Sequence, residues 1–440
     1  MNALDRFFKL REHRTSVRTE IVAGLTTFAA MAYILAVNPQ ILSTTGMDFG
    51  AVVTATALAS ALMTAIFAFA TNWPIALAPG MGLNAFFAFT ICGAMHVPWQ
   101  AALAMVFASG VCFLLLTATG IRQRIVEAIP KELKLAISCG IGLFIAFIGL
   151  KNGGLVVAHP ATLVSAGNFR DPRVLLVLSG IVLTAALHWR GVKGAIILGV
   201  IALAVAGCFI PAAGGGMLTK LPERFIAAPA SVAPTAFAMD FRYLFEHPAQ
   251  TLPLIFAFLF VDLFDNMGTL IGVCSRLGYL DSNGQLPGIG RALAADATAA
   301  IVGSCLGTST VTSYIESAAG AEEGGRTGLT SLVVSACFLA GLFLHPLLRV
   351  IPAEATAPAL VIVGVLMMQN AQELDLRDFG KSVPCVLTML LMPLTFSISE
   401  GLAIGFVAYA ALMLISGRAA RVSWVAWALA ALFLAHLILR

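Results

Sequence analysis

Charged residues are scarce in this sequence. Asp, Glu, Lys and Arg make up 11% of its 440 residues, whereas soluble domains carry about a quarter. Hydrophobic residues reach 59%, and the mean hydropathy is +0.94. These values exclude a soluble globular domain and predict an all-α protein that crosses a membrane many times. The net charge of +4 is small, and the basic residues lie mainly in short loops, so nothing indicates a nucleic-acid partner.

Paired cysteines and metal-ligand patterns are also missing. The eight cysteines stand singly inside apolar segments and form no C-x-x-C motif, which argues against a zinc site or a disulfide framework. The seven histidines show no metal-ligand spacing either. Because no nucleophile stands with a base and no metal cluster is indicated, we expect no enzymatic activity, no metal and no cofactor.

Long apolar runs are what the sequence has in abundance. A helix needs about twenty apolar residues to cross a bilayer, and we predict seven spans before a proline-rich linker at 211–250 and seven after it. A last run, 422–439, either makes a fifteenth crossing or indicates that 382–416 is one broken span. The predicted spans are 19–42, 51–71, 74–95, 98–120, 133–150, 173–189, 192–210, 251–279, 289–306, 307–322, 327–347, 356–371, 382–397 and 399–416.

The placement of basic residues predicts the orientation of these spans. Residues 1–18 are charged and lack a signal-peptide pattern, so we expect them to be retained and cytoplasmic. The first outer loop, 43–50, has no Lys or Arg. A cytoplasmic N-terminus satisfies the positive-inside rule, because it puts these later basic residues on the same side: Arg122, Arg124, Lys131, Lys134, Arg190, Lys193, Arg276, Arg291, Arg377 and Lys381.

Two spans are interrupted at corresponding places in the two halves. The third, ALAPGMGLNAFFAF, has Pro79 and two glycines ahead of Asn84, and the tenth, GTSTVTSYIESAAG, carries Glu316. Pro and Gly disfavour a continuous helix, so each segment is predicted to be a short extended piece followed by a half helix. In the tenth span we expect the helix to begin near Ser313, with Glu316 in its first turn.

An odd number of spans in each half requires the halves to have opposite orientations. Such inverted repeats place the binding site where interrupted helices meet. Irregular backbone and a carboxylate are both costly in lipid, which makes this region the predicted functional site. The alternative is that Ser and Thr in the tenth span only allow close helix packing, but packing does not account for Glu316.

Other polar residues in apolar runs are further candidates. Asp262 and Asp265 in the eighth span are three residues apart, on one side of a helix. They face a cavity or each other, unless one or both cap a broken helix or bond to neighbouring hydroxyls. Asn84 could be a helix N-cap or bind a ligand through its amide, and Phe86 could stack on an aromatic ligand or pack in the core. Three residues of the first span are candidates for lining the same cavity: Tyr33, Asn38 and Gln40.

Several motifs of the chain resemble one family. They are FKLREH, TEIVAGLTTF, VNPQIL, APGMGLNAFFAF, LFDNMGTLIGV, GTSTVTSYIESAAG and GGRTGLT, and together with the flanking sequence they run from Phe8 to beyond Glu400. In them the chain is similar to the nucleobase:cation symporters of the nucleobase–ascorbate transporter superfamily, in the AzgA-like branch of hypoxanthine, guanine and adenine permeases.

The resemblance implies fourteen spans in two inverted repeats of seven. A core domain would comprise 19–120 and 251–347, and a gate domain 133–210 and 356–440, through which members of the superfamily often form homodimers. The family's two acids fall on Asp265 and Glu316 and its asparagine on Asn84, with substrate between the strand-like pieces of spans three and ten. Asp262 matches less firmly, since related permeases can carry Asn there.

The expected function is proton-coupled uptake of a purine nucleobase across a bacterial-type inner membrane. Asp265 and Glu316 would accept hydrogen bonds from ring N–H or amino groups, and Asn84 would read the opposite edge or tie the two strands together. Backbone N–H groups near Phe86 and Ile315 would complete the pocket. One of the acids would carry the proton, and these residues would support the site: Asp262, Thr308 and Ser309.

Two alternatives concern the substrate. An anion exchanger or channel could use the same fold, but it would favour a cationic or neutral site over these acids. Among purines, the sequence leaves open adenine against guanine or hypoxanthine, and it leaves open which acid takes the proton.

Overall fold

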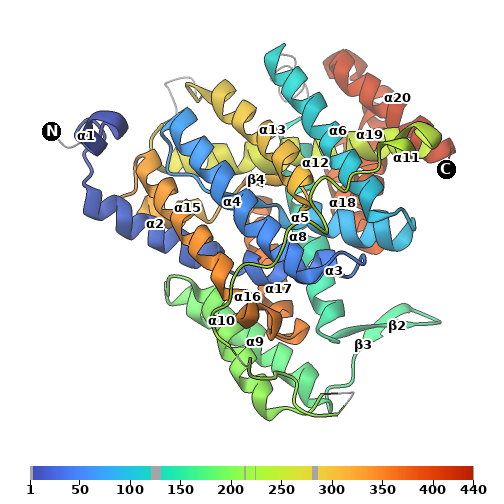
Figure 1. Ribbon diagram of the computed structural model, residues 1–440. Coiled ribbons are helices and arrows are strands. Elements are labelled where there is room, and N and C mark those ends of the chain that lie inside the picture. The colour runs from blue at the N-terminus through green and yellow to red at the C-terminus, as the bar shows by residue number, and fades with distance from the viewer. Residues whose placement is uncertain (1–2, 120–129, 213–214, 223, 280–285, 440) are drawn as a thin grey trace.

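The computed structural model describes residues 3–119, 130–212, 215–222, 224–279 and 286–439, which form a bundle of helices (Figure 1). Within them, ten helical stretches are long and apolar enough to cross a membrane. This confirms a helical multi-pass membrane protein, while the predicted Arg122 and Arg124 lie outside the described residues. The ten stretches are Val17–Ser43, Phe49–Thr71, Trp99–Ala118, Lys131–Asn152, Pro172–Trp189, Pro248–Arg276, Ile289–Leu306, Gly328–Arg349, Ala353–Glu373 and Ile398–Ile415, and four shorter apolar helices are Met81–Ala94, Ala195–Phe209, Phe379–Leu394 and Trp424–Ala435.

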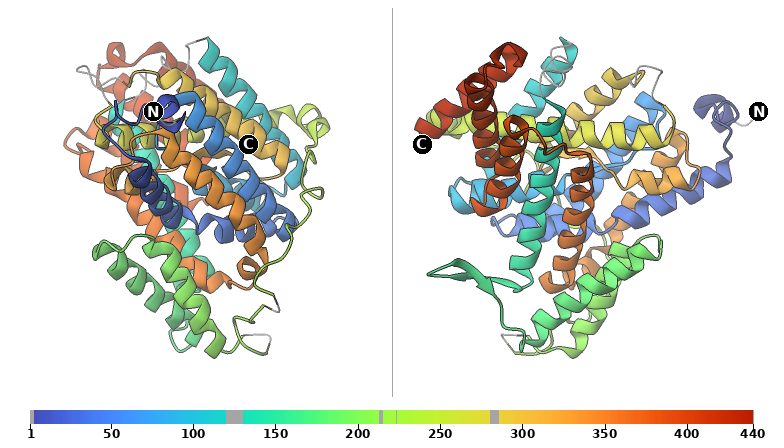
Figure 2. Two further views of the ribbon diagram at one scale, coloured as in Figure 1. Left: turned by 60° about the vertical axis from the view of Figure 1, so that its left-hand side comes forward. Right: turned by 180° about the vertical axis from the view of Figure 1, so that it is seen from behind.

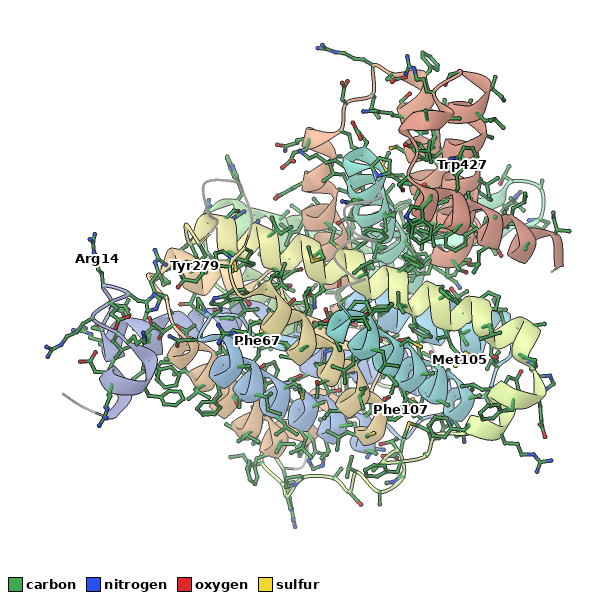
Figure 3. All side chains as sticks on the ribbon, turned by 90° about the horizontal axis from the view of Figure 1, so that it is seen from above. Arg14, Phe67, Met105, Phe107, Tyr279 and Trp427 are labelled. Atoms are coloured by element: carbon green, nitrogen blue, oxygen red, sulfur yellow. The ribbon has the colours of Figure 1, made fainter. Side chains whose placement is uncertain are left out.

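One group of helices packs together in the part of the bundle that holds the N-terminus. It comprises α2 (Val17–Met31), α3 (Ile34–Ser43), α4 (Phe49–Thr71), α6 (Trp99–Ala118), α12 (Pro248–Arg276), α13 (Ile289–Leu306) and α15 (Gly328–Gly341). In this group α13 packs against α4 and α6, and α15 packs against α2 and α4. Phe67 and Met105 are buried between these helices, whereas Arg14 projects away from the N-terminal end (Figure 3).

A second group packs around α8. It comprises α8 (Lys131–Asn152), α9 (Pro172–Trp189), α10 (Ala195–Ala206), α17 (Ala353–Met368), α18 (Phe379–Leu394), α19 (Ile398–Ile415) and α20 (Trp424–Leu439). The interpretation of 382–416 as one broken span is wrong, because α18 and α19 are separate helices that pack against each other. The short connection between them contains Phe396 in the left-handed region, with φ of +54°, and α20 packs against α19.

The remaining elements are short. They are α1 (Ala3–Phe8), β2 (Val156–His159), β3 (Leu163–Ala166), η2 (Gly207–Phe209), α11 (Phe241–Glu246), η3 (Leu342–Leu344), α16 (His345–Arg349), η4 (Gln369–Glu373) and η5 (Ala419–Arg421). The β2–β3 hairpin, which the sequence analysis did not predict, projects away from the helices (Figure 2). The described part of the predicted linker, 211–250, is mostly irregular. Leu218 packs on Leu176 and Leu203 of the second group, whereas later residues lie on the first group, where the Phe237 N–H donates to the Cys305 carbonyl at 2.7 Å.

Two short strands cross where the interrupted spans meet. β1 (Leu77–Pro79) and β4 (Val311–Ser313) are fully buried and pair antiparallel, with Ala78 opposite Thr312. β1 leads into α5 (Met81–Ala85) and the π-helix η1 (Phe86–Ala94), and β4 is followed by α14 (Ser317–Glu322). Pairing satisfies backbone groups that lipid cannot, and it confirms the predicted strand-like breaks followed by half helices.

The predicted start of the second half helix is wrong. Ser313 belongs to β4, where it lies opposite Leu77, and the next residue, Tyr314, donates its N–H to the Ala76 carbonyl at 2.9 Å. Because the backbone of Ser313 and Tyr314 pairs with the segment of β1, α14 begins only at Ser317. Glu316 therefore lies directly before the helix and not in its first turn.

Candidate functional site

The strand crossing brings a carboxylate from α12 next to both interrupted spans. A Cβ atom on Gly80 would lie 2.9 Å from Thr312 Cγ2 and 3.7 Å from Asp265 Oδ2. The distance to Thr312 is shorter than a Cβ atom normally allows, so a glycine at this position permits the close approach of β4, while Asp265 lies at ordinary contact distance. Asp265, predicted from the sequence, thus lies at the end of β1, and its side chain is partly accessible.

Three carboxylates form an acidic cluster here: Asp265, Asp296 and Glu316. Asp265 lies close enough to the other two for electrostatic interaction. Asp296, on α13, is fully buried and accepts a hydrogen bond from the Thr312 hydroxyl at 3.2 Å. Sequence reasoning missed Asp296, although a single carboxylate in the apolar run 289–306 was a usable signal. Asp262, predicted beside Asp265, is buried one turn earlier on α12.

Glu316 is held by a residue from the first span. The Tyr33 hydroxyl donates to Glu316 Oε1 at 2.8 Å, and Tyr33 is 1% exposed in the turn between α2 and α3. The hydroxyl of Tyr314 donates instead to the Pro79 carbonyl at 2.5 Å. The expectation that Tyr33 lies near the site agrees with this geometry, while Tyr314 was missed.

Asn84 ties the two interrupted spans together. Its side chain is fully buried, and its Oδ1 accepts a hydrogen bond from the Ser309 hydroxyl. The N-cap interpretation is wrong, because Asn84 lies inside α5 and its N–H donates to the Gly80 carbonyl at 2.8 Å. Next to Ser309, the Thr308 hydroxyl accepts from Asn38 Nδ2 at 2.9 Å, so the predicted support residues link three separate segments.

The prediction of backbone donors near Phe86 and Ile315 stays a prediction. The N–H of Phe86 itself donates to the carbonyls of Gly82 and Leu83 within the helix. Its ring is fully buried and packs edge to face on Phe258, with centroids 5.1 Å apart. Ile315 lies between β4 and α14 with 40% of its surface exposed.

Several buried polar atoms near the strand crossing have spare hydrogen-bonding capacity. Among the described residues, neither amide atom of Asn266 has a partner, and the hydroxyls of Thr310 and Ser313 have none. All three residues are at most 2% exposed. Buried polar groups are normally paired, so this arrangement is suited to a polar ligand. No group of three His, Cys, Asp or Glu side chains in the described ranges could hold a metal ion.

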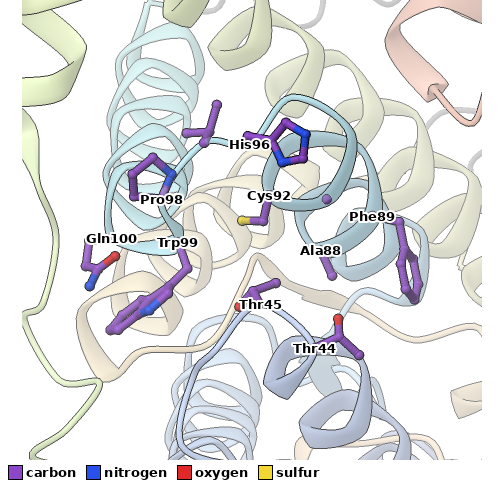
Figure 4. A pocket seen from close by; sticks show the side chains of 11 residues that line it. Thr44, Thr45, Ala88, Phe89, Cys92, His96, Pro98, Trp99 and Gln100 are labelled. Carbon is purple, nitrogen blue, oxygen red and sulfur yellow. The ribbon is translucent and has the colours of Figure 1, made fainter.

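A separate pocket lies at the far end of the first half helix. It has a volume of about 480 Å³ and opens between the end of α3, η1 and the start of α6 (Figure 4). Its wall includes Ala88, Phe89 and Cys92, which follow Asn84 along the same helix. None of the acids of the cluster lines it, so the predicted site and this pocket are distinct. The other lining residues are Thr44, Thr45, Gly93, His96, Val97, Pro98, Trp99 and Gln100.

Comparison with solved structures identifies the fold. The transmembrane domain of the cyanobacterial bicarbonate transporter BicA superposes with a TM-score of 0.62, covering 88% of this chain and 96% of that one, at 16% identity. At this identity the likeness concerns the fold alone.

Sequence comparison identifies the family. The Permease family matches residues 18–404. The chain is 43% identical to the guanine/hypoxanthine permease PbuG of Bacillus subtilis, over 98% of this chain and 99% of the relative. It is 42% identical to the adenine permease AdeP of Escherichia coli, over 94% and 91%. The chain therefore belongs to the Permease family, within the nucleobase–ascorbate transporter superfamily.

Proposed function

We propose that this protein imports a purine nucleobase together with a proton, across a bacterial-type inner membrane. The observation that carries the proposal is the convergence of Asp265 and Glu316 on the buried strand crossing. Carboxylates accept hydrogen bonds from N–H groups, which purine rings and their amino groups supply. The adenine and guanine/hypoxanthine permeases named above support this class of substrate.

In this proposal the base lies against the strand crossing and its N–H groups donate to Asp265 and Glu316. Asn84 supports the site through its bond to Ser309, and the unpartnered amide of Asn266 is available to an acceptor atom of the base. The exposed Ile315 would cover one face of the ring. Asp262 and Thr308 would hold the surrounding segments.

Proton coupling is proposed from the same acidic cluster. Three negative charges close together in a buried site are costly, and uptake of one proton lowers that cost when a neutral base is carried. Either Asp265 or Glu316 would take the proton, because both are partly accessible whereas Asp296 is fully buried.

Transport requires the two groups of helices to move relative to each other. We propose fourteen spans in inverted repeats, with the first group as core and the second as gate, a cytoplasmic N-terminus, and dimerisation through the gate. Gln40 on α3 donates to the Ile351 carbonyl at 2.7 Å and accepts from the Thr356 hydroxyl at 2.5 Å. At another point Lys193 pairs with Glu323. These contacts join the proposed core and gate. They would break and form again during the transport cycle.

Anion exchange is the second candidate, because the fold neighbour is a bicarbonate transporter. Fold likeness alone does not assign a substrate. A site with three carboxylates repels an anion, and this charge favours the nucleobase.

The test is uptake of radiolabelled adenine, guanine, hypoxanthine and uracil into cells lacking their own permeases, with and without a protonophore. Accumulation of a purine that collapses with the proton gradient supports the proposal. If the protein reaches the membrane and no base accumulates, the purine assignment fails and bicarbonate or another anion becomes the substrate to test.

A further inference from the structure

Tyr33 makes a contact that the proposed function does not use. Its hydroxyl donates to Glu316 Oε1 at 2.8 Å across 283 residues of sequence. A hydrogen bond to a carboxylate is short and about twice as strong as one between neutral groups. A carboxylate has about four acceptor positions on its two oxygens, so Tyr33 and a base could bind Glu316 together.

The Glu316 carboxylate has a local hydrogen-bond partner in the backbone of the same residue, and Tyr33 is its side-chain partner. Glu316 follows a strand of three residues and precedes a helix of six. A glutamate side chain has several rotatable bonds, and ordering it costs conformational entropy. A partner from outside the segment restricts the direction of the carboxylate further. The buried Tyr33 ring, which has few rotamers, supplies such a partner.

The helix before Tyr33 is itself tied to the segment after Glu316. Glu20, near the start of α2, is fully buried and accepts backbone N–H groups of Arg326 at 2.9 Å, Thr327 at 3.2 Å and Thr330 at 3.1 Å. These donors belong to the connection between α14 and α15 and to the first turn of α15. The start of α2 thus bonds through Glu20 to the residues that follow α14. The end of α2 leads to Tyr33, which bonds to Glu316.

Close packing fixes the middle of the same contact. A Cβ atom on Gly320 of α14 would lie 2.1 Å from Thr27 Oγ1 and 2.6 Å from the Ala23 carbonyl of α2. α14 therefore packs directly on α2. A side chain at the end of α2 can position Glu316 only because this packing sets their distance.

We propose that Tyr33 is a positioning residue of the substrate site: its hydroxyl fixes the direction of the Glu316 carboxylate, and the Glu20 anchor on α2 holds Tyr33 at the required distance. This inference rests on the proposed function. It assigns Tyr33 a role in both base affinity and proton coupling, because it acts on an acid that serves both.

The test is Tyr33→Phe, which removes one hydroxyl and keeps the ring. We measure KM and maximal rate of purine uptake between pH 5 and 8, with the amount of protein in the membrane determined by immunoblot. KM is expected to rise about tenfold, the value of one hydrogen bond of about 1.4 kcal/mol. The pH midpoint of uptake is expected to move to higher pH, because the ionised carboxylate loses a donor that stabilises it.

Tyr243→Phe is the matched control. It removes a phenol hydroxyl that bonds to Gln250 at 3.2 Å, away from the strand crossing, and should leave KM and the pH midpoint unchanged. Glu20→Gln should raise KM and shift the pH midpoint in the same direction as Tyr33→Phe but by less, because Glu20 acts on Glu316 only through the position of Tyr33.

Two results overturn the inference while leaving purine uptake intact. One is Tyr33→Phe with unchanged KM and pH midpoint. The other is a loss of protein or maximal rate alone, which is what a purely structural tyrosine would produce. Absence of purine uptake in the wild type is different, since it refutes the proposed function itself.

Discussion

The two interrupted spans share a plan but use their polar residues differently. Each has a strand of three residues followed by helix, and the strands pair antiparallel. After β1 the helix continues through five residues of α5 and nine of η1, whereas α14 has six residues. The polar residue of the first, Asn84, is used inside the protein on Ser309, while Glu316 is partly accessible and held by Tyr33.

The two half helices also pack against different helix groups. Gly82 in the first half helix lies against Ile141 of α8, in the second group, whereas Gly320 in the second lies against α2, in its own group. The first interruption therefore contacts the second helix group through Gly82, and its Asn84 bonds to Ser309 near the strand crossing. The second interruption carries the partly accessible Glu316, and its helix packs on α2.

The largest effect is expected for Glu316→Gln. Removing the charge takes away a strong acceptor of the base and a proton site, so the ratio kcat/KM for purine uptake should fall about 100-fold. Radiolabelled uptake measures it. Glu322→Gln is the control, since Glu322 is exposed and pairs with Arg276. Equal losses in both variants would contradict a special role for Glu316.

Asn84→Ala should have a smaller effect, about tenfold on kcat/KM, because a neutral hydrogen bond is lost and Ser309 is left without its acceptor. Ser309→Ala should resemble it, and the double variant should be little worse than either, since both remove one bond. Asn168→Ala, in an exposed loop, is the control. A fully additive double variant would show that Asn84 and Ser309 act separately.

Substitution of Gly320 and of Gly82 by alanine compares how tightly the two half helices are packed, measured by the midpoint of thermal unfolding. Gly320→Ala would drive a methyl group into Thr27 and backbone of α2, and overpacking of this kind costs about 1–3 kcal/mol. The midpoint of thermal unfolding in detergent should drop by several degrees. Gly82→Ala should cost less, because the nearest atom is a methyl of Ile141, which can move. Gly290→Ala, with open space around it, is the control, and a larger drop for Gly82→Ala would reverse the assignment.

The smallest effect is expected for Lys193→Gln. It breaks the ion pair with Glu323 at the end of the second half helix, where the lysine side chain is 51% exposed. Exposed ion pairs contribute about 0–1 kcal/mol, so the unfolding midpoint should change by no more than a degree or two. Arg242→Gln, which breaks an exposed pair with Glu246, should behave alike. A drop as large as that of Gly320→Ala would show that the pair holds the fold together.

Much of the architecture could be predicted from local sequence. The helical multi-pass class and both interruptions follow from apolar run length and from Pro and Gly, which act on neighbouring backbone. Errors arose where a distant segment decides the outcome. α14 begins four residues later than predicted, because β4 pairs with β1 from a distant part of the chain.

The sequence by itself determined the membrane class, the family and two of the three acids, because hydropathy and motifs are properties of contiguous residues. Only the tertiary structure decided which side chains meet. It pairs Tyr33 with Glu316 and Ser309 with Asn84, residues 283 and 225 positions apart, and adds Asp296 to the cluster. These contacts depend on how the two interrupted spans cross, and no local pattern specifies the register of strands so far apart in the chain.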